Sequence, residues 1–161
     1  MALLPIIQYP DPVLAAKAEP VTEFNDELRK LAADMAETMY AAPGVGLAAN
    51  QVGSLKRIVV IDIGEGPIVM VNPEILETSG SQTGQEGCLS LPGQAGIVTR
   101  PNYVKVRALD ENGEPYEFEG TELLARAVCH ECDHLDGIMY VRYVEGELMD
   151  VSGEEAEEIE E

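Results

Sequence analysis

The 161-residue sequence predicts an α+β fold with mainly antiparallel β-sheets, an amphipathic helix near the N-terminus and a second, buried helix late in the chain. Three observations support this prediction. One stretch places apolar residues at helical spacing, several β-branched runs are separated by turn residues, and a later stretch is apolar on nearly every side. The length and the 45% hydrophobic content fit a single globular domain with its own core.

The first predicted helix lies in the stretch NDELRKLAADMAETMYAA. Asn25 is a suitable N-cap, because its side-chain oxygen can accept a hydrogen bond from a backbone N–H of the first turn. One stripe of the helix is apolar and consists of Leu28, Leu31, Ala32, Met35 and Met39. We expect this stripe to pack on the core.

Two antiparallel strand pairs are predicted after this helix. The β-branched runs RIVVIDI and PIVMVNPEI are separated by a turn that contains Gly64 and Gly66. Further on, YVKVRALD and EPYEFEG are separated by ENG, which is a strong hairpin signal. Each pair is expected to form neighbouring strands of a sheet.

The second predicted helix lies in TELLARAVCHECDHLDG. Thr121 is a candidate N-cap, and Gly137 is a candidate for the position just after the C-cap. From Leu123 to Cys129 the helix is apolar nearly all round, which is typical of a buried helix.

The charge of the chain is strongly negative and uneven. A net charge of −20 argues against any broad electrostatic contact with nucleic acid or anionic lipid. Residues 145–161 carry nine acids and no bases. We expect residues 145–161 to be an acidic tail after a folded domain of residues 1–144. Because like charges repel, its end, VSGEEAEEIEE, is expected to be a solvated tail or a frayed helix.

The sequence contains no segment that predicts secretion or membrane insertion. The first twenty residues lack a basic start and a sustained apolar run, and no later stretch reaches the roughly 18 apolar residues of a membrane span. Two of the three cysteines, Cys129 and Cys132, fall within one predicted helix, so a disulfide framework is not expected. We expect a soluble monomer in the cytoplasm.

The only two histidines, His130 and His134, suggest a metal site. Four residues apart, they lie about 40° apart around a helix, so both imidazoles can reach one ion. Glu131 lies on an adjoining face, where a carboxylate can take a proton from water and return it during hydrolysis. The alternative is a pair of ordinary histidines on a helix.

A catalytic site of this kind needs a third protein ligand. Metalloproteases with the longer version of this motif would have a histidine at position 140, where this chain has Tyr140. Cys129 and Cys132 lie about 100° and 200° around the helix from His130 and are expected to be core thiols. Cys88, in the glycine- and proline-containing segment GQEGCLSLPG, is the favoured ligand, with a buried structural thiol as the alternative.

The segment PGVGLAANQVG predicts a glycine-rich turn. Gly44 and Gly46 allow positive φ or the close approach of a substrate backbone, and the Gln51 amide can donate a hydrogen bond. An ordinary turn before a strand explains the same residues. A phosphate-binding loop is excluded, because the Lys-Ser/Thr ending is absent.

Together, GVGLAANQ, EGCLS and HECDH resemble the three motifs of the bacterial peptide deformylases, in the same order. The resemblance extends from about Pro5 to Tyr143. It implies an α+β fold in which β-sheet surrounds the metal-binding helix, residues 1–144 as the catalytic domain, and removal of the formyl group from the N-formylmethionine of nascent chains.

The resemblance also implies a role for individual residues. The implied metal ligands are Cys88, His130 and His134. The implied catalytic residues are Glu131 as general base and acid, and Gln51 with the Leu89 backbone N–H as oxyanion donors. The implied substrate-binding residues are Gly46, along the peptide, and Val45, Leu123 and Ala127, near the methionine side chain.

The resemblance also implies a cofactor and partners, and the sequence departs from the family pattern at two places. Cys-His₂ ligation suits zinc, and also iron or nickel; because the family is associated with ferrous iron, one Fe²⁺ ion is expected, with Zn²⁺ or Ni²⁺ as alternatives. Cys129 replaces a glutamine that many members have. The chain lacks the basic C-terminal helix with which some members dock on the ribosome, so any ribosome contact is expected to be transient or made elsewhere.

Residues around the site leave further alternatives open. Glu86 and Arg100 either pair beside the site or form a solvated surface pair, and Asp133 is expected to hold local structure. Two rival functions also fit the HECDH motif: a general metallopeptidase with another third ligand, and a non-catalytic metal-binding module.

Overall fold

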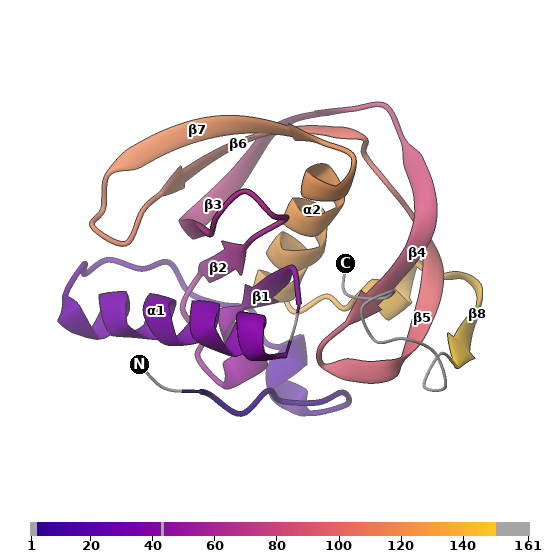
Figure 1. Cartoon of the computed structure of the whole chain (residues 1–161), viewed down its shortest axis with the longest axis horizontal. Helices are drawn as coiled ribbons and strands as arrows, with labels where there is room; N and C mark the ends of the chain where they lie inside the picture. The colour runs from indigo at the N-terminus through magenta and orange to yellow at the C-terminus, as the bar shows by residue number, and fades with distance from the viewer. Residues whose placement is uncertain (1–2, 43, 151–161) are drawn as a thin grey trace.

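The computed structural model describes residues 3–42 and 44–150 and has the predicted α+β architecture (Figure 1). The helices are α1 (Asp26–Ala41) and α2 (Leu123–Leu135), with short 3-10 turns η1 (Pro12–Ala15), η2 (Ala49–Val52) and η3 (Tyr140–Tyr143). The strands are β1 (Gly46–Ala48), β2 (Ile58–Ile61), β3 (Ile68–Ser79), β4 (Gln82–Cys88), β5 (Leu91–Arg100), β6 (Tyr103–Leu109), β7 (Pro115–Thr121) and β8 (Glu145–Asp150). No helix in the described ranges is long and apolar enough to cross a membrane.

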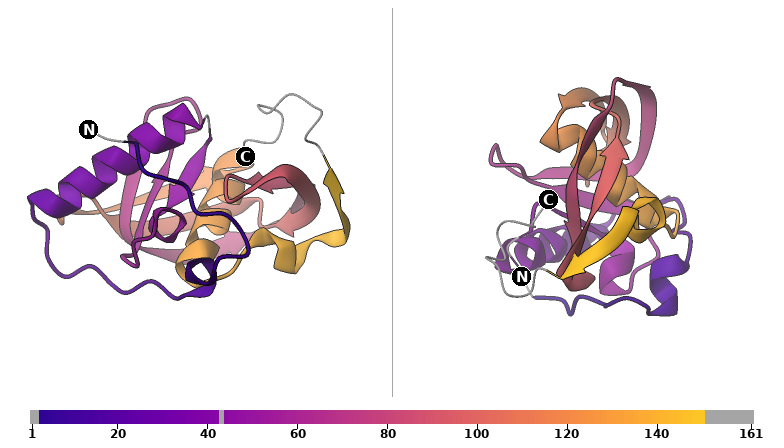
Figure 2. Two further views of the ribbon diagram at one scale, coloured as in Figure 1. Left: turned by 90° about the horizontal axis from the view of Figure 1, so that it is seen from below. Right: turned by 90° about the vertical axis from the view of Figure 1, so that its right-hand side faces the viewer.

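A five-stranded antiparallel sheet in the order β1-β2-β3-β6-β7 separates the two helices (Figures 1 and 2). Successive side chains of a strand point to opposite faces, so Val59 and Ile61 pack towards α2, whereas Ile58 and Val60 pack towards α1. Both faces of β2 are therefore buried, which explains its uninterrupted apolar sequence. Both strand pairings predicted from the sequence, β2 with β3 and β6 with β7, are confirmed.

Helix α1 has the predicted cap and apolar stripe. The Asn25 side chain accepts a hydrogen bond from the Leu28 N–H at 2.9 Å. The buried members of the stripe are Leu28, Ala32, Met35 and Met39, while Leu31 is half-buried against the same cluster. Fully burying one such side chain contributes about 1.5–3 kcal/mol, so the stripe is what attaches α1 to the sheet.

Helix α2 lies between the five-stranded sheet and a smaller sheet with the order β4-β5-β8 (Figure 1). The smaller sheet was not predicted. The glycines and prolines of GQEGCLSLPG suggested a loop, but this segment forms the end of β4, a tight turn and the start of β5. Likewise Gly46 begins strand β1 and is not in a turn. Pairing with neighbouring strands outweighs the weak strand preference of glycine in both places.

The expectation that the acidic tail begins at residue 145 is wrong for residues 145–150. These residues form β8, which pairs with β5 although all six are exposed. Gly146, Leu148 and Met149 separate the three acidic residues of this strand, so no two acids are adjacent, which reduces their repulsion while the backbone pairs. Residues 151–161, the rest of the expected tail, lie outside the described residues.

The ends of α2 only partly match the prediction. Thr121 belongs to β7, opposite Tyr103, and the N-cap is Glu122, which has a positive φ and no side-chain capping bond. Gly137 does follow the C-cap as predicted, with a φ of +77° and an N–H that donates to the His134 carbonyl at 2.9 Å. A Cβ at Gly137 would lie 2.5 Å from the Ala15 carbonyl oxygen, so only glycine fits.

Replacing Asn25 tests the N-cap of α1. We expect Asn25→Ala to lower the free energy of unfolding by about 0.5–2 kcal/mol, because the Leu28 N–H loses its acceptor. Asn25→Asp keeps an acceptor and should behave like the wild type. Urea denaturation monitored by circular dichroism measures both. Equal losses in the two variants would show that the cap has no role.

Candidate metal centre

Three potential ligands come together on α2 and at the end of β4. The ligand atoms of Cys88, His130 and His134 all lie within 4.8 Å of one another, and the Cys88 Sγ is 3.3 Å from the His134 Nε2. Sulfur and nitrogen ligands around a tetrahedral ion lie about 3.3–3.6 Å apart, so this set fits one metal ion. The hypothesis that Cys88 joins the two histidines is supported by this geometry.

The backbone explains how each ligand reaches the centre. His130 and His134 are one helical turn apart on the buried helix α2, and their ring centroids are 5.0 Å apart. Cys88 ends β4 at a register shift between Gly87 and Cys88, where the pairing with β5 becomes irregular. At this end of the strand Cys88 reaches α2, with its Sγ 3.3 Å from the His134 Nε2.

Neither cysteine of α2 belongs to the ligand set, as predicted. Cys129 is buried in the apolar cluster between α2 and the five-stranded sheet, and Cys132 packs against the same cluster. Burial raises the pKa of Cys129 to about 11, so its thiol is protonated and unreactive at neutral pH. Tyr140 is also buried, with its ring centroid 5.9 Å from that of His130, and forms a wall beside the centre.

A fully buried carboxylate, Glu86, lies behind the first histidine. Its Oε1 is 2.7 Å from the His130 Nδ1, and Arg100 donates to both of its oxygens, at 2.8 and 3.2 Å. A proton on Nδ1 then leaves the His130 Nε2 free as a ligand atom. Burial disfavours ionisation of Glu86, but hydrogen bonds from His130 and Arg100 outweigh it and hold its pKa well below the ordinary value.

Glu86 and Arg100 therefore form a buried pair and not a solvated one. Arg100 also pairs with Asp133 at 2.7 Å, which gives Asp133 the local structural role expected of it. The chain thus uses one arginine of β5 to hold two carboxylates, one from β4 and one from α2.

The charges around the histidines favour a bound cation. Burial opposes protonation of His130, but the Glu131 charge and hydrogen bonds to Cys88 and Glu86 raise its pKa above the ordinary value. Burial, together with the charge of His130, lowers the pKa of His134, which keeps that imidazole neutral and able to bind metal. Anions that attract a proton in this way attract a divalent ion as well.

Glu131 lies against the glycine-containing segment before η2. A Cβ at Gly46 would lie 2.6 Å from the Glu131 Oε2, so glycine lets the two elements come into contact. The other oxygen, Oε1, is buried and makes no hydrogen bond in the described part of the chain. Burial raises the pKa of Glu131 to about 7. The carboxylate has one oxygen available for a reactant.

The Gln51 amide is held in one orientation. Its Oε1 accepts a hydrogen bond from the Ala48 N–H at 2.9 Å, while its Nε2 lies 3.0 Å from the Ser90 Oγ and 3.6 Å from the Cys88 Sγ. The amide donor therefore points towards the centre. Leu89 directly follows Cys88 in the β4–β5 turn, and a Cβ at Gly44 would lie 2.7 Å from its side chain.

The sequence matches known proteins over nearly its whole length. The profile of the family described as polypeptide deformylase matches residues 3–148. A peptide deformylase of Agathobacter rectalis is 62% identical over 158 residues, covering 98% of this chain and 100% of that protein. A peptide deformylase of Lachnoclostridium phytofermentans is 57% identical over 151 residues, covering 92% and 93%.

The chain belongs to the polypeptide deformylase family. Solved structures of the family share its fold. The peptide deformylase of Thermotoga maritima superposes with a TM-score of 0.88 at 41% identity and covers 89% of this chain and 99% of its own. The Ehrlichia chaffeensis peptide deformylase, in complex with actinonin, also gives 0.88, at 39% identity and 90% coverage of both chains.

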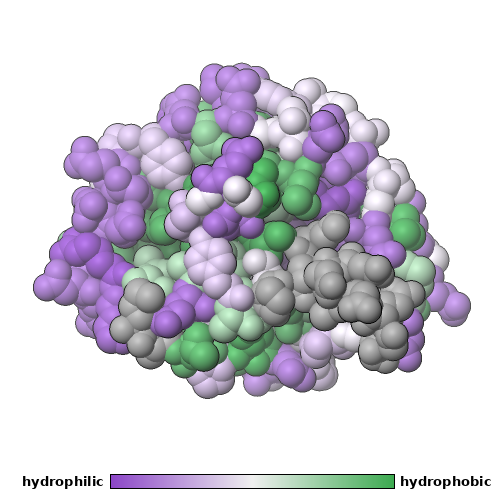
Figure 3. Space-filling view, viewed as in Figure 1, coloured by the Kyte–Doolittle hydropathy of each residue, from purple (hydrophilic) through white to green (hydrophobic). Residues whose placement is uncertain are grey.

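The residues that family resemblance assigns to the substrate lie on separate elements. Val45 and Leu123 are half-buried, before β1 and at the start of α2, whereas Ala127 is buried in the cluster between α2 and the sheet. Figure 3 shows apolar surface in the middle of the face where α2 lies, bordered by hydrophilic residues. Contact of these residues with a substrate stays a prediction.

Two buried polar residues near the centre were missed from the sequence. The Asn50 amide donates to the His134 carbonyl, and the Arg126 guanidinium donates to Glu86 at 2.6 Å. Arg126 could have been found, because a charged residue in a helix that is otherwise apolar requires a buried partner. Asn50 has no such signal, since asparagine is common in turns.

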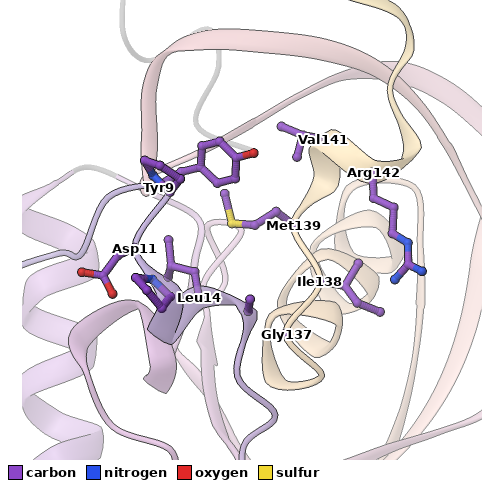
Figure 4. Close-up of a pocket in the computed structure, with 11 residues that line it drawn as sticks. Tyr9, Asp11, Leu14, Gly137, Ile138, Met139, Val141 and Arg142 are labelled. Atoms are coloured by element: carbon purple, nitrogen blue, oxygen red, sulfur yellow. The ribbon is translucent and has the colours of Figure 1, made fainter.

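A separate cavity of about 260 Å³ lies beyond the C-terminal end of α2 (Figure 4). Leu14 and Met139 point into it from the N-terminal segment and from the segment after α2, with Tyr9 and Arg142 at its edges. It contains none of the three metal-ligand candidates and is distinct from the deformylase-family centre.

Metal analysis of cysteine variants tests the ligand set. Cys88→Ala should lose most of its bound metal, because the remaining histidines provide only two ligands. Cys129→Ala and Cys132→Ala are matched controls on α2 and should keep the wild-type metal content. Elemental analysis of the folded variants, after removal of loosely bound ions, measures this. Loss of metal from either control alone would contradict the assignment.

Proposed function

We propose that this protein removes the formyl group from N-formylmethionyl ends of newly made polypeptides and releases formate. One observation carries the proposal: Cys88, His130 and His134 come together as a ligand set in a chain of the deformylase family, with Glu131 next to His130 on α2, where its charge acts on that imidazole. Besides its oxygen and the amide nitrogen, the formyl carbon carries only a hydrogen atom, so it is an unhindered target for water.

Cys88, His130 and His134 would hold one divalent ion. When bound, the ion polarises the formyl carbonyl and increases the acidity of water at neutral pH. Fe²⁺ is proposed as the native ion, with Zn²⁺ and Ni²⁺ as alternatives that accept the same ligands.

Glu131 is the proposed general base and general acid. Glu131 directly follows the ligand histidine His130. Its Oε1 is buried and lacks a hydrogen-bond partner among the described residues, so this oxygen can accept a proton from water. The same carboxyl group then gives the proton to the nitrogen of the leaving amine. Burial away from bulk solvent keeps this proton within the site.

Gln51 and Leu89 are the proposed oxyanion donors. The bond from the Ala48 N–H holds the Gln51 carbonyl oxygen, which directs its NH₂ group to the Cys88 side of the centre. The Leu89 backbone N–H comes directly after the same cysteine. A neutral amide and a backbone N–H can both stabilise a developing negative charge; loss of one such donor costs about 10²–10³ in rate.

Strand β1 is the proposed docking edge for the peptide. It is the first strand in the order of the sheet and pairs with β2 on one side, so its other edge can pair with an extended peptide through Gly46. Val45, Leu123 and Ala127 are proposed to contact the methionine side chain. A cytoplasmic location, a monomeric state and any transient ribosome contact remain predictions from the sequence.

Three substrates distinguish this function from its rivals. We expect formate release from formyl-Met-Ala-Ser, and no hydrolysis of Met-Ala-Ser or of a longer acetylated peptide. Glu131→Gln should lower kcat about 10²–10⁴-fold with its metal content unchanged, because proton transfer is lost. Glu27→Gln, at an exposed position on α1, is the control. Cleavage of the unformylated peptides would indicate a general metallopeptidase, and full activity of Glu131→Gln would exclude its role.

The native ion has a separate test. If it is Fe²⁺, protein purified with iron under nitrogen should lose activity on exposure to air, through oxidation of the iron or of Cys88. Replacement by Ni²⁺ or Co²⁺ should restore formate release and make it stable in air. Undiminished activity of the iron protein after prolonged aeration would contradict ferrous iron as the native ion.

A further inference from the structure

The guanidinium of Arg126 is buried behind the metal centre. Only 3% of the residue is exposed, and the side chain leaves α2 one turn before His130. Its Nη1 donates to the Glu86 Oε2 at 2.6 Å, its Nη2 to the Val98 carbonyl at 3.2 Å, and its Nε to the Gln82 Oε1 at 3.4 Å.

Each oxygen of Glu86 is held from two directions. Oε1 interacts with His130 and Arg100, and Oε2 accepts from Arg126 and Arg100. Two cations, Arg100 and Arg126, therefore balance two anions, Glu86 and Asp133, in one buried cluster. Removing Arg126 would leave the cluster with an uncompensated negative charge and the Glu86 Oε2 with one donor at 3.2 Å.

We infer that Arg126 is a positioning residue for the metal centre: through Glu86 it fixes the His130 ring with Nδ1 towards the carboxylate and Nε2 towards the metal. Arg126 and His130 are on the same helix, and Glu86 precedes the third ligand, Cys88, by two residues on β4. The Arg126–Glu86 pair thus joins the two elements that carry the ligands. Groups that orient a ligand histidine typically change metal affinity 10–100-fold when they are removed.

Arg100 cannot replace this contact. It comes from β5, shares its guanidinium with Asp133 and lies over the Tyr143 ring, 5.4 Å from the centroid. Arg100 reaches α2 at Asp133. Arg126 is itself a residue of α2 and adds a second bond from this helix to Glu86, beside that of His130.

A purely stabilising ion pair is the alternative, because breaking any buried pair destabilises a protein. Arg57 offers a matched control. It is also a mostly buried arginine and donates to the Ala18 and Leu135 carbonyls at 3.1 Å and to Asp136 at 3.0 Å, at the opposite end of α2 from Arg126. Arg57→Met should lower the melting temperature without affecting the metal.

The test measures metal binding directly. Zn²⁺ affinity is obtained by competition with a chromophoric chelator, and the geometry of the centre from the visible absorption of the Co²⁺-loaded protein. We expect Arg126→Met to weaken Zn²⁺ binding 10–100-fold and to alter the Co²⁺ spectrum, with kcat lowered and KM for formyl-Met-Ala-Ser unchanged. Arg126→Lys keeps the charge and one donor, so it should restore part of the affinity, and it carries the test if Arg126→Met does not fold.

A double variant checks that Arg126 acts through Glu86. If it does, adding Arg126→Met to Glu86→Gln should weaken Zn²⁺ binding no further than Glu86→Gln alone. Wild-type affinity and spectrum in Arg126→Met, with only a loss of melting temperature like that of Arg57→Met, would overturn the inference, and so would additive losses in the double variant. The positioning role of Arg126 rests on the proposed function only in that a divalent metal binds at the centre. If the wild type binds Zn²⁺ but releases no formate, the proposed function is contradicted, and the effect of Arg126 on Zn²⁺ binding can still be measured.

Discussion

The burial of α2 between two sheets is the constraint on which the rest of the structure depends. Arg126, His130, Glu131 and His134 are all buried on this helix, and burying polar or charged groups is costly unless each has a partner. Glu86 supplies a partner to two of them, and Cys88 lies beside a third. Both lie in the last three residues of β4, which explains why the β4–β5 hairpin packs against the helix.

The groups proposed for catalysis reach the centre because small residues let backbones approach. Gly46 allows β1 to contact Glu131, and Gly44 makes room for the Leu89 side chain. The Gln51 amide is oriented by a backbone bond and not by a reactant, so its donor is in place before any substrate binds. A rigid arrangement of this kind reduces the reorganisation that the reaction itself would require.

Local patterns predicted the parts of the fold that bury an apolar face. The stripe and cap of α1 and the two hairpins were found because side-chain periodicity and turn residues determine them within a short stretch. Strands β4, β5 and β8 were missed because glycine, proline and acidic residues favour loops and tails in isolation. These three strands are stabilised by pairing with one another, and this pairing cannot be predicted from a short stretch of sequence.

By itself, the sequence determined that His130 and His134 share one face of a helix, because the helical repeat relates residues four apart wherever the helix lies. It also excluded a third histidine, since Tyr140 occupies that position. Only the tertiary structure brought Cys88 to within 3.3 Å of His134, and only it placed Glu86 and Arg126 behind His130. These contacts join residues 40 to 46 positions apart, so they depend on how separate elements pack.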